Sequence, residues 1–500
     1  MTNQSKPIYN NDTIIALATP SGIGAIGVIR LSGPDAISLA NEVFNGKDLS
    51  IQKTHTIHFG SIKDGDLILD EVLVSIFIGP KSYTRENVVE ISTHGSAFII
   101  ESIIKLLVRN GARPANPGEF TLRAFLNGQL DLSQAEAVAD LIASNSKASH
   151  QVAMQQMRGG FSHELQHLRD QLIHFASMIE LELDFGEEDV EFANREDLKA
   201  LIYQIMRILH RLIQSFEQGN VMKNGVPVVI AGKPNVGKST LLNALLNEER
   251  AIVSEIAGTT RDTVEDEMII GGINFRFIDT AGIRETVDII EAKGVERTHE
   301  KIGQAKLIIY LVDPEQEVSE IETQVEYLEG LGVPFITVVN KVDVASPEFM
   351  EVVSSINPIA IGYQVSRSEG DNPGHTSDSP NSQEPAPQLS TVNRQLSTIL
   401  YISARNKVGI DALKNTILQT IGLHSINTDD VLISNIRHLE ALQKTEASLN
   451  SVLENIDNPV TSDFLATDIK QALYYLGEIT GQVTTDDLLE TIFSKFCIGK

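Results

Sequence analysis

The sequence predicts a multidomain fold of α/β and α+β type, in which a β-rich N-terminal domain precedes an all-α domain that is interrupted by an α/β domain. Three observations carry this prediction. Short β-branched runs broken by Gly, Pro and Asp fill residues 13–121. Apolar residues recur at helical spacing over 132–219 and again after 430. Apolar runs alternate with helical stretches over 226–422, which is typical of a mainly parallel sheet.

The domain boundaries follow these changes of pattern. A chain of 500 residues has room for about three domains. We place the segments at 1–125, 126–224, 225–423 and 424–500, with the second and fourth forming one helical domain. Residues 364–397 are rich in Ser, Pro, Gly, Asn, Asp and Gln. Such a segment cannot bury enough apolar surface to order itself, so we expect a disordered surface insertion there.

The composition argues against several classes of function. The sequence has 67 acidic and 40 basic residues, a formal charge of −27. This charge disfavours a large basic surface for DNA or an anionic membrane, but it leaves room for a local basic patch that binds structured RNA. The single cysteine, Cys497, allows no intramolecular disulfide and suits a reducing compartment. The polar first residues and the lack of a long apolar run predict a cytoplasmic protein.

The N-terminal segment is expected to form a group of strands with one packed helix, Ala97–Arg109. The glycine pattern Gly22–Gly27 matches the G-x-G-x-x-G fingerprint of dinucleotide-binding sites. The residues after it predict a strand where the fingerprint requires a helix, so we reject a dinucleotide site. The expected strands are Thr13–Leu17, Val28–Leu31, Val72–Ile78 and Val88–Ser92.

The helical domain begins near Leu132, where Ser133 and Glu136 have the spacing of a capping box. Apolar residues then follow a helical period on both sides of the α/β domain. Before it these are Leu165, Leu168, Leu172, Phe175 and Ile179, and after it they are Leu432, Ile436, Leu439, Leu442, Leu465, Ile469, Ala472, Leu473 and Leu476.

A phosphate-binding loop opens the α/β domain. The expected strand Val228–Ala231 is followed by GKPNVGKS, Gly232–Ser239, and then by the helical stretch Thr240–Leu246. This is the G-x-x-x-x-G-K-[ST] pattern in the strand–loop–helix context that it requires. The glycines let the backbone curl around a phosphate, Lys238 would reach the β- and γ-phosphates, and Ser239 would coordinate Mg²⁺.

Three further motifs follow in order, each after an expected strand. Asp279–Gly282 would hold the magnesium shell and the γ-phosphate. Asn340–Asp343 ends in a carboxylate that can accept from both N1–H and the 2-amino group of guanine, a donor pair that adenine does not present. Ser403–Arg405 forms the turn that would back the base. The four motifs together predict a GTP-hydrolysing enzyme, with a P-loop ATPase or kinase as the disfavoured alternative.

The residue after the Asp279–Gly282 motif is Ile283, which cannot orient the attacking water as the glutamine of Ras-like proteins does. The sequence as a whole resembles the MnmE (TrmE) family of tRNA uridine-modification GTPases. The resemblance covers nearly the whole chain outside the insertion. It is carried by GKPNVGKS, IAGTTRD (Ile256–Asp262), DTAGIR, AFLNGQLDLSQAEAVADLI (Ala124–Ile142), VEISTHG (Val89–Gly95) and the ending FCIGK.

The resemblance implies a G domain whose hydrolysis is assisted by potassium. It places K⁺ at Asn235, Ser254, Ile256 and Thr259, and Mg²⁺ at Ser239 and Thr260. Glu291 would orient the water, while Lys238 and Arg261 would contribute to catalysis. The full set implied to bind GTP is Gly232, Asn235, Val236, Gly237, Lys238, Ser239, Thr240, Ser254, Glu255, Ile256, Ala257, Gly258, Thr259, Thr260, Asp279, Thr280, Ala281, Gly282, Asn340, Lys341, Asp343, Ser403, Ala404 and Arg405.

The resemblance also implies an N-terminal domain that dimerises and holds a 5-formyl- or methylene-tetrahydrofolate as one-carbon donor. The folate contacts map to Arg30, Glu90, Gln129 and Lys500. The third position is usually lysine, so Gln129 is a departure that loses charge attraction to the folate's glutamate tail.

Cys497 has two interpretations. A lone cysteine is commonly a small buried residue, whereas a thiolate beside Lys495 or Lys500 would be reactive. The last four residues do not fit a prenylation signal, because Gly499 is not aliphatic and lysine is not a usual terminal residue.

The function implied by the resemblance is the addition of a carboxymethylaminomethyl or aminomethyl group at C5 of wobble uridine 34 in certain tRNAs. The chain would act as a homodimer and form a heterotetramer with the FAD-dependent flavoprotein MnmG (GidA). The alternative is an Era-like ribosome-assembly switch, against which the β-rich N-terminal domain and the lack of a basic KH-like tail both count.

Overall fold

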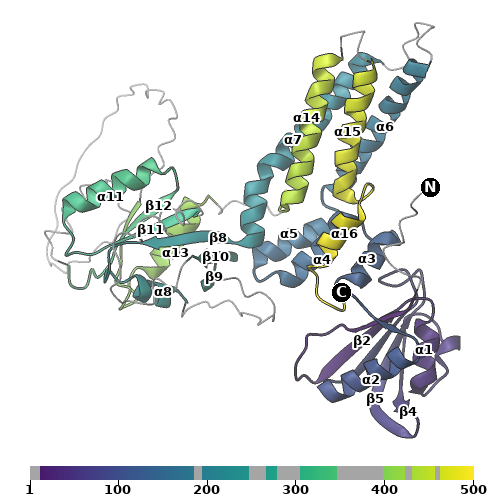
Figure 1. Cartoon of the computed structure of the whole chain (residues 1–500). Helices are drawn as coiled ribbons and strands as arrows, with labels where there is room; N and C mark the ends of the chain where they lie inside the picture. Colours follow the sequence, from purple (N-terminus) through teal and green to yellow (C-terminus); the bar gives the residue numbers. More distant parts are fainter. Residues whose placement is uncertain are drawn as a thin grey trace, which may run out of the picture. The chain divides into compact units, whose positions relative to one another are not determined.

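The computed structural model describes residues 12–184, 194–246, 266–278, 305–345, 398–422, 431–456 and 462–500 (Figure 1). The chain divides into two compact units. The first comprises Met1–Ser144, His150–Lys223 and Val431–Lys500, and the second comprises Asn145–Ser149 and Asn224–Asp430. The predicted insertion of the α/β domain into the helical part of the chain is confirmed, because the first unit resumes after the second. The predicted disordered insertion lies outside the described residues.

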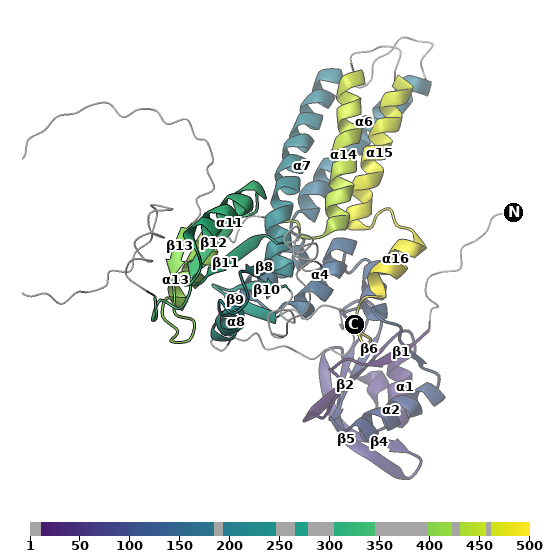
Figure 2. The ribbon, with the colours of Figure 1, turned by 60° about the vertical axis from the view of Figure 1, so that its left-hand side comes forward.

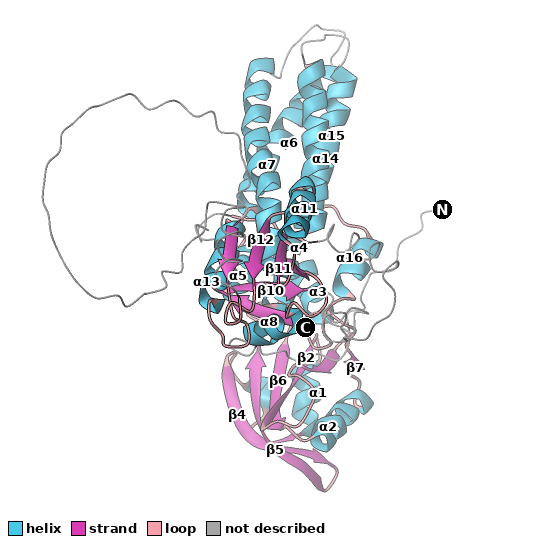
Figure 3. Cartoon of the chain, turned by 90° about the vertical axis from the view of Figure 1, so that its left-hand side faces the viewer, coloured by secondary structure: helices cyan, strands magenta, loops and turns pink. Residues whose placement is uncertain are grey.

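The N-terminal part of the first unit is a seven-stranded sheet in the order β3-β4-β5-β6-β2-β1-β7. Its strands are antiparallel apart from the β1–β7 pair. Helices α1 and α2 contact the sheet and cover its apolar face, where Ile29, Leu31, Val89 and Ile91 are buried (Figure 3). The elements are β1 Ile14–Leu17, β2 Ile26–Ser32, α1 Ala36–Val43, β3 Phe44–Asn45, the 3₁₀ turn Leu49–Ile51, β4 Thr56–Asp64, β5 Leu67–Phe77, β6 Val88–His94, α2 Ala97–Arg109 and β7 Arg113–Pro114.

The expected strands and helix of this domain are all present. The glycine pattern Gly22–Gly27 runs into β2, so the predicted strand, and not a helix, follows it. The other face of the sheet is the more exposed one, because side chains alternate between the two faces along each strand.

The helical part of the first unit is built around four long helices, α6, α7, α14 and α15, which run side by side in Figures 1 and 2. Their shared core is mostly Leu and Ile, and it includes most of the apolar residues whose spacing predicted these helices. The helical elements are α3 Glu119–Leu126, α4 Leu132–Ala143, α5 Lys147–Met157, α6 Ser162–Asp184, α7 Arg195–Asn224, α14 Ile436–Asn455, α15 Ser462–Thr480 and α16 Asp486–Phe493. No described helix is long and apolar enough to span a membrane.

A capping box is present at the start of α4, but the prediction that Ser133 and Glu136 form it is wrong. Asp131 is the N-cap, its side chain accepts from the Gln134 backbone N–H, and the Gln134 side chain accepts from the Asp131 backbone N–H. Ser133 is buried inside the helix, and Glu136 bonds to other elements. Asp and Gln fill the two roles as well as Ser and Glu do, and the helix begins one residue after Asp131.

Glu136 joins the two sequence halves of the helical domain. Its carboxylate accepts from Nε and Nη2 of Arg437, at 2.9 and 2.8 Å, and lies 2.8 Å from Nε2 of His438. Burial would raise the pKa of Glu136, but the hydrogen bonds from His438 and Arg437 outweigh it and lower the pKa to about 2. For His438, in contrast, burial lowers the pKa. A neutral imidazole that donates from Nε2 fits this arrangement, with Arg437 supplying the positive charge.

The second unit is a six-stranded sheet in the order β13-β12-β11-β8-β10-β9, parallel except for β9. Its central strand β11 is buried along its whole length, as expected for a sheet covered on both faces. The elements are β8 Val226–Ala231, α8 Lys238–Leu246, β9 Asp266–Ile270, β10 Ile273–Phe277, β11 Leu307–Val312, α11 Val318–Gly330, β12 Phe335–Val339, β13 Thr398–Tyr401 and α13 Ile410–Thr420. The predicted α/β class is confirmed.

Replacing Glu136 by Gln should destabilise the first unit by about 3–5 kcal/mol, because it leaves Arg437 without its carboxylate in a mostly buried position. Thermal unfolding at neutral pH, followed by calorimetry, measures the loss. The stability that Glu136 contributes is present above its ordinary pKa of 4.5 and is lost as the pH falls towards about 2. The difference between the wild type and the variant should therefore narrow below a pH of about 4.5.

The matched control is Glu164→Gln, because Glu164 pairs with Arg211 and both side chains are exposed. This change should cost about 1 kcal/mol or less. Equal losses for the two variants, or a Glu136 effect that does not depend on pH, would contradict the assignment.

Candidate functional site

The predicted phosphate loop lies between β8 and α8, at the carboxyl end of a central strand of the sheet. Three of its residues have positive φ, namely Gly232 at 147°, Asn235 at 66° and Gly237 at 99°. A Cβ atom on Gly232 would lie 2.5 Å from the carbonyl oxygen of Leu311, so only glycine fits there. The loop therefore curls tightly and leads straight into the N-terminus of α8, the arrangement that binds phosphate.

Lys238, the first residue of α8, folds back over this loop. Its Nζ donates to the carbonyl oxygens of Gly232, at 2.6 Å, and of Lys233, at 3.4 Å. Partial burial lowers the pKa of Lys238. A phosphate at the loop would favour the charged ammonium and oppose that shift.

Asn340 ties three of the predicted motifs together. The side chain is 2 % exposed. Its Nδ2 donates to the carbonyl oxygen of Val236 at 2.8 Å, and its Oδ1 accepts from the backbone N–H of Ala404 at 3.0 Å. A Cβ on Gly237 would lie 2.3 Å from that Nδ2, so the loop glycine makes room for the amide. The phosphate loop and the two downstream motifs are thus held by one side chain.

Asp343 lies exposed beside the same group. A hydrogen bond from Ser403 lowers the pKa of Asp343, with smaller contributions from a backbone hydrogen bond and the charge of Arg405. The Asp343 carboxylate is therefore ionised at neutral pH. Lys341, two residues before it, has a positive φ of 60° and forms an ion pair with Asp313.

Part of the predicted site lies outside the described residues. This part comprises the K⁺ and Mg²⁺ positions of the following loop, the second motif and the residue assigned to the water. They are Ser254, Glu255, Ile256, Ala257, Gly258, Thr259, Thr260, Arg261, Asp279, Thr280, Ala281, Gly282 and Glu291.

In the N-terminal domain, the structure brings Arg30 and Glu90 into direct contact. They face each other across β2 and β6, with Nε and Nη2 of Arg30 at 2.9 and 2.8 Å from Oε1 of Glu90. The guanidinium also lies 5.6 Å from the ring centre of Tyr83 and 5.7 Å from that of Phe120. Sequence reasoning missed both rings, because an isolated Tyr or Phe is indistinguishable from a core residue.

The segment around Lys500 reaches the same place. The Lys500 carbonyl oxygen accepts from the backbone N–H of Phe120 at 3.2 Å. A Cβ on Gly499 would lie 2.2 Å from the carbonyl oxygen of Leu17, so the segment packs closely against the end of β1. Cys497 is exposed, and its interpretation as a small buried residue is therefore wrong. The backbone of Cys497 is nevertheless bonded, because its carbonyl oxygen accepts from the backbone N–H groups of Gly118 and Lys500.

Gln129 joins the cluster through a different residue. Its Oε1 accepts from Nε of Arg85 at 3.0 Å, and Nη1 of the same arginine donates to the carbonyl oxygen of Asn127 at 3.1 Å. Arg85 lies two residues from Tyr83. The turn that carries Gln129 is therefore fastened to the loop that carries the Tyr83 ring.

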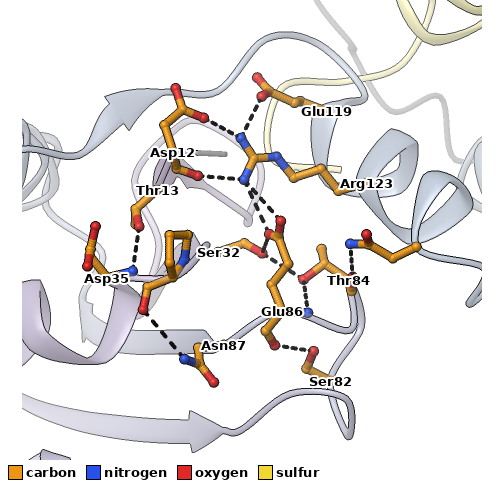
Figure 4. Close-up of polar contacts among 12 residues, drawn as sticks. Asp12, Thr13, Ser32, Asp35, Ser82, Thr84, Glu86, Asn87, Glu119 and Arg123 are labelled. Atoms are coloured by element: carbon orange, nitrogen blue, oxygen red, sulfur yellow. Dashed lines mark hydrogen bonds and ion pairs between the residues drawn. The ribbon is translucent and has the colours of Figure 1, made fainter. Parts of the chain in front are cut away.

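A buried arginine, Arg123 on α3, bonds to the loop that carries Tyr83 (Figure 4). Arg123 is 0 % exposed and forms ion pairs with Asp12, Glu86 and Glu119. Glu86 in turn accepts from the hydroxyl of Ser32 at 2.6 Å. Sequence reasoning missed Arg123, since nothing in its neighbours marks a buried cation. The network fixes the loop of Tyr83 relative to the helix of Phe120.

The comparisons with known proteins cover nearly the whole chain. The family model of the MnmE helical domain matches residues 132–497, and that of the GTP-binding protein TrmE N-terminus matches residues 13–129. The chain is 55% identical over 492 residues to the tRNA modification GTPase MnmE of Cytophaga hutchinsonii, covering 98% of each chain. It is 52% identical to that of Christiangramia forsetii, over 98% of this chain and 99% of the relative.

A more distant relative matches to the same extent. The tRNA modification GTPase MnmE of Bacteroides thetaiotaomicron is 46% identical, over 98% of this chain and 100% of its own length. Since both the identity and the coverage are high, the resemblance found in the sequence is confirmed, and this chain belongs to the MnmE (TrmE) family of tRNA modification GTPases.

Proposed function

We propose that this chain is a potassium-dependent GTPase that works with the flavoprotein MnmG. Together they would add a carboxymethylaminomethyl or aminomethyl group to C5 of wobble uridine 34 in certain tRNAs, with a tetrahydrofolate as one-carbon donor. The observation that carries the nucleotide part is the Asn340 side chain, which binds both the phosphate loop and the Ala404 turn. No observation favours an Era-like switch, because the family match extends through the N-terminal domain.

Guanine recognition falls to Asp343. Its ionised carboxylate can accept from N1–H and the 2-amino group of guanine at the same time, and these are charge-assisted hydrogen bonds. Ser403 holds the carboxylate in place, and Ala404 is fixed by Asn340. Lys341 would lie along the face of the base, in keeping with its positive φ of 60° and its ion pair with Asp313.

The phosphates fit the loop Gly232–Ser239. Its backbone N–H groups and the ammonium of Lys238 would bind them, with Thr240 next along α8. Ser239 and Thr260 have the hydroxyl oxygens that Mg²⁺ prefers. Bound there, Mg²⁺ would neutralise charge on the phosphates.

Potassium fits Asn235, whose side chain is exposed at the turn of the loop where the backbone is left-handed. The other proposed oxygen ligands are Ser254, Ile256 and Thr259. Bound K⁺ would offset negative charge that develops during hydrolysis, as an arginine finger does elsewhere. Because Ile283 has no hydrogen-bonding group, we assign the attacking water to Glu291, with Arg261 shaping the loop.

The folate fits the cluster around Arg30. Glu90 can accept from the N–H donors of a pterin ring, and the rings of Tyr83 and Phe120 offer apolar contact area. Lys500 lies beside Phe120 and supplies a positive charge for the ligand. Gln129 would donate or accept a neutral hydrogen bond where a lysine would add charge.

A second copy of the chain fits the exposed face of the N-terminal sheet. Ile57, Phe59 and Leu73 are 65%, 67% and 47% exposed there. Phe59 lies opposite Leu73 in the register, and Leu73 lies opposite Ser92, so these residues share the face of Glu90. An apolar group of this kind beside the folate cluster is suited to a homodimer, which would bind MnmG as a heterotetramer in the cytoplasm. The exposed Cys497 is available for thiolate chemistry beside Lys500.

Replacing Asp343 by Asn should weaken GTP binding about 10- to 100-fold, since two charge-assisted hydrogen bonds are lost. The same variant should gain affinity for xanthosine triphosphate, because the amide can donate to the 2-oxo group. Competition binding with both nucleotides measures the switch. Asp411→Asn, an exposed change at the start of α13, is the control and should alter neither affinity. An unchanged GTP affinity in Asp343→Asn would contradict the role in base recognition.

Exchanging K⁺ for Na⁺ should lower GTP turnover about tenfold or more, since Na⁺ is too small for the same oxygen ligands to reach it together. Asn235→Ala should lower turnover in K⁺ to a similar extent. Asn243→Ala, an exposed change on α8, is the matched control and should keep the potassium effect. Equal rates in the two salts would remove the cation from the mechanism.

Arg30→Ala should reduce the affinity for 5-formyl-tetrahydrofolate about tenfold or more, because it leaves Glu90 without its ion-pair partner and removes the cation between the two rings. Isothermal calorimetry measures the affinity. Arg109→Ala breaks an exposed ion pair with Asp64 on the same domain and should have no effect. The folate assignment fails if both variants bind as the wild type does.

A further inference from the structure

One arginine of the N-terminal domain differs from the others in its partners. The domain has five arginines, all of them among the described residues. Four of them form ion pairs with Asp or Glu side chains, namely Arg30, Arg109, Arg113 and Arg123. Arg85 is exposed, and within the described part of the chain it bonds only to neutral groups. Its positive charge is therefore not compensated, although the sequence carries a formal charge of −27.

Arg85 is held in one position by the turn that follows α3. Its Nε donates to Oε1 of Gln129 at 3.0 Å, and its Nη1 donates to the carbonyl oxygen of Asn127 at 3.1 Å. A Cβ on Gly128, between these two residues, would lie 3.5 Å from Nη1, so the guanidinium lies against the turn. Both acceptors are amide oxygens without a net charge. They orient the guanidinium and leave its positive charge available.

The backbone of Arg85 has a conformation that is uncommon for so large a residue. Its φ is 60°, in the left-handed region that residues with a Cβ atom rarely occupy. The loop is held in this shape from two sides. The backbone N–H of Arg85 donates to the carbonyl oxygen of Ser82 at 3.4 Å, and Nδ2 of Asn127 donates to the carbonyl oxygen of Thr84 at 2.7 Å. Backbone strain of this kind is concentrated at sites that bind ligands.

Arg85 is close along the chain to the aromatic ring beside Arg30. Tyr83 lies two residues before Arg85, which is a span of at most about 7 Å of backbone. The ring centre of Tyr83 lies 5.6 Å from the guanidinium of Arg30. Within the described residues, Nη2 of Arg85 has no hydrogen-bond partner, so its donors are left for a ligand. A planar guanidinium with open N–H groups is suited to a carboxylate.

We propose that Arg85 binds a carboxylate of the folate's glutamate tail, and that Gln129 orients Arg85 for this role. The proposal rests on the proposed function, which places the folate against Arg30, Glu90 and Tyr83. A lysine at position 129 would set a second positive charge beside the guanidinium and repel it. The neutral amide of Gln129 instead accepts from Arg85, and the arginine supplies the charge that Gln129 lacks.

Arg85→Gly tests the proposal, because glycine removes the guanidinium and adopts a φ of 60° without strain. Calorimetry compares 5-formyl-tetrahydrofolate with its bisamide, a ligand of nearly equal size in which both glutamate carboxylates are neutral. The wild type should bind the acid more tightly than the bisamide. In Arg85→Gly this preference should fall about tenfold or more at low salt, since a charge-assisted hydrogen bond is lost, while the affinity for the bisamide stays within about twofold.

A second substitution should restore the charge from the other side of the contact. Gln129→Lys, made in the Arg85→Gly variant, should return most of the preference for the acid, because the lysine no longer meets a guanidinium. This rescue separates a lost charge from a folding defect, which a lysine on the neighbouring turn would not repair. The matched control is Lys81→Ala, which removes an exposed cation from the same loop and should leave both affinities unchanged.

The proposal is overturned if Arg85→Gly keeps the wild-type preference for the acid, if it loses affinity for both ligands equally, or if Gln129→Lys does not restore the preference. A wild type that binds the acid and the bisamide equally also overturns it, and leaves the folate assignment intact. A wild type that binds neither ligand overturns the folate assignment itself, so the two failures are distinguishable.

Discussion

The buried carboxylate of Glu136 is the interaction on which the architecture depends. It accepts from two side chains that lie more than 300 residues further along the sequence, at 2.8–2.9 Å. Apolar contacts between helices are not directional and would not by themselves define how α4 meets α14. A bidentate ion pair with Arg437 allows only one register, and the neutral ring of His438 fills the remaining acceptor position. The contact fixes α14 shortly after the point at which the first unit resumes.

Two arginines of the N-terminal domain show how the same side chain serves opposite purposes. Arg123 is fully buried and forms ion pairs with three carboxylates. These ion pairs hold the loop of Tyr83 against α3. Within the described part of the chain, Arg30 pairs with one carboxylate, that of Glu90, and lies partly exposed near the rings of Tyr83 and Phe120. The first gives rigidity, and the second keeps donors that a ligand can reach. Arg123 holds the loop of Tyr83 and the helix of Phe120 in place, and it thereby fixes the two rings that lie beside Arg30.

Sequence patterns predicted the elements of this protein better than the contacts between them. The strands, the long helices and the inserted α/β domain followed from periodicity, since the apolar face of an element must repeat with its geometry. Motif spacing also led to the phosphate loop, Asn340 and Asp343. The capping box at α4 was assigned to the wrong residues, because Asp131 and Gln134 satisfy the same rule two positions earlier. Arg123, Tyr83 and the position of Arg85 depend on partners far away in sequence, which no local pattern contains.

The close packing of Gly499 against Leu17 has a consequence for how the protein is made. Chains fold as they emerge from the ribosome, earlier parts first. The G domain is nearly continuous in sequence and can close while translation is still under way, whereas the first unit needs segments from both sides of it. The cluster around Arg30 is complete only after almost all of the chain has been synthesised. Premature termination would thus release a protein with an intact second unit but an unfinished cluster around Arg30.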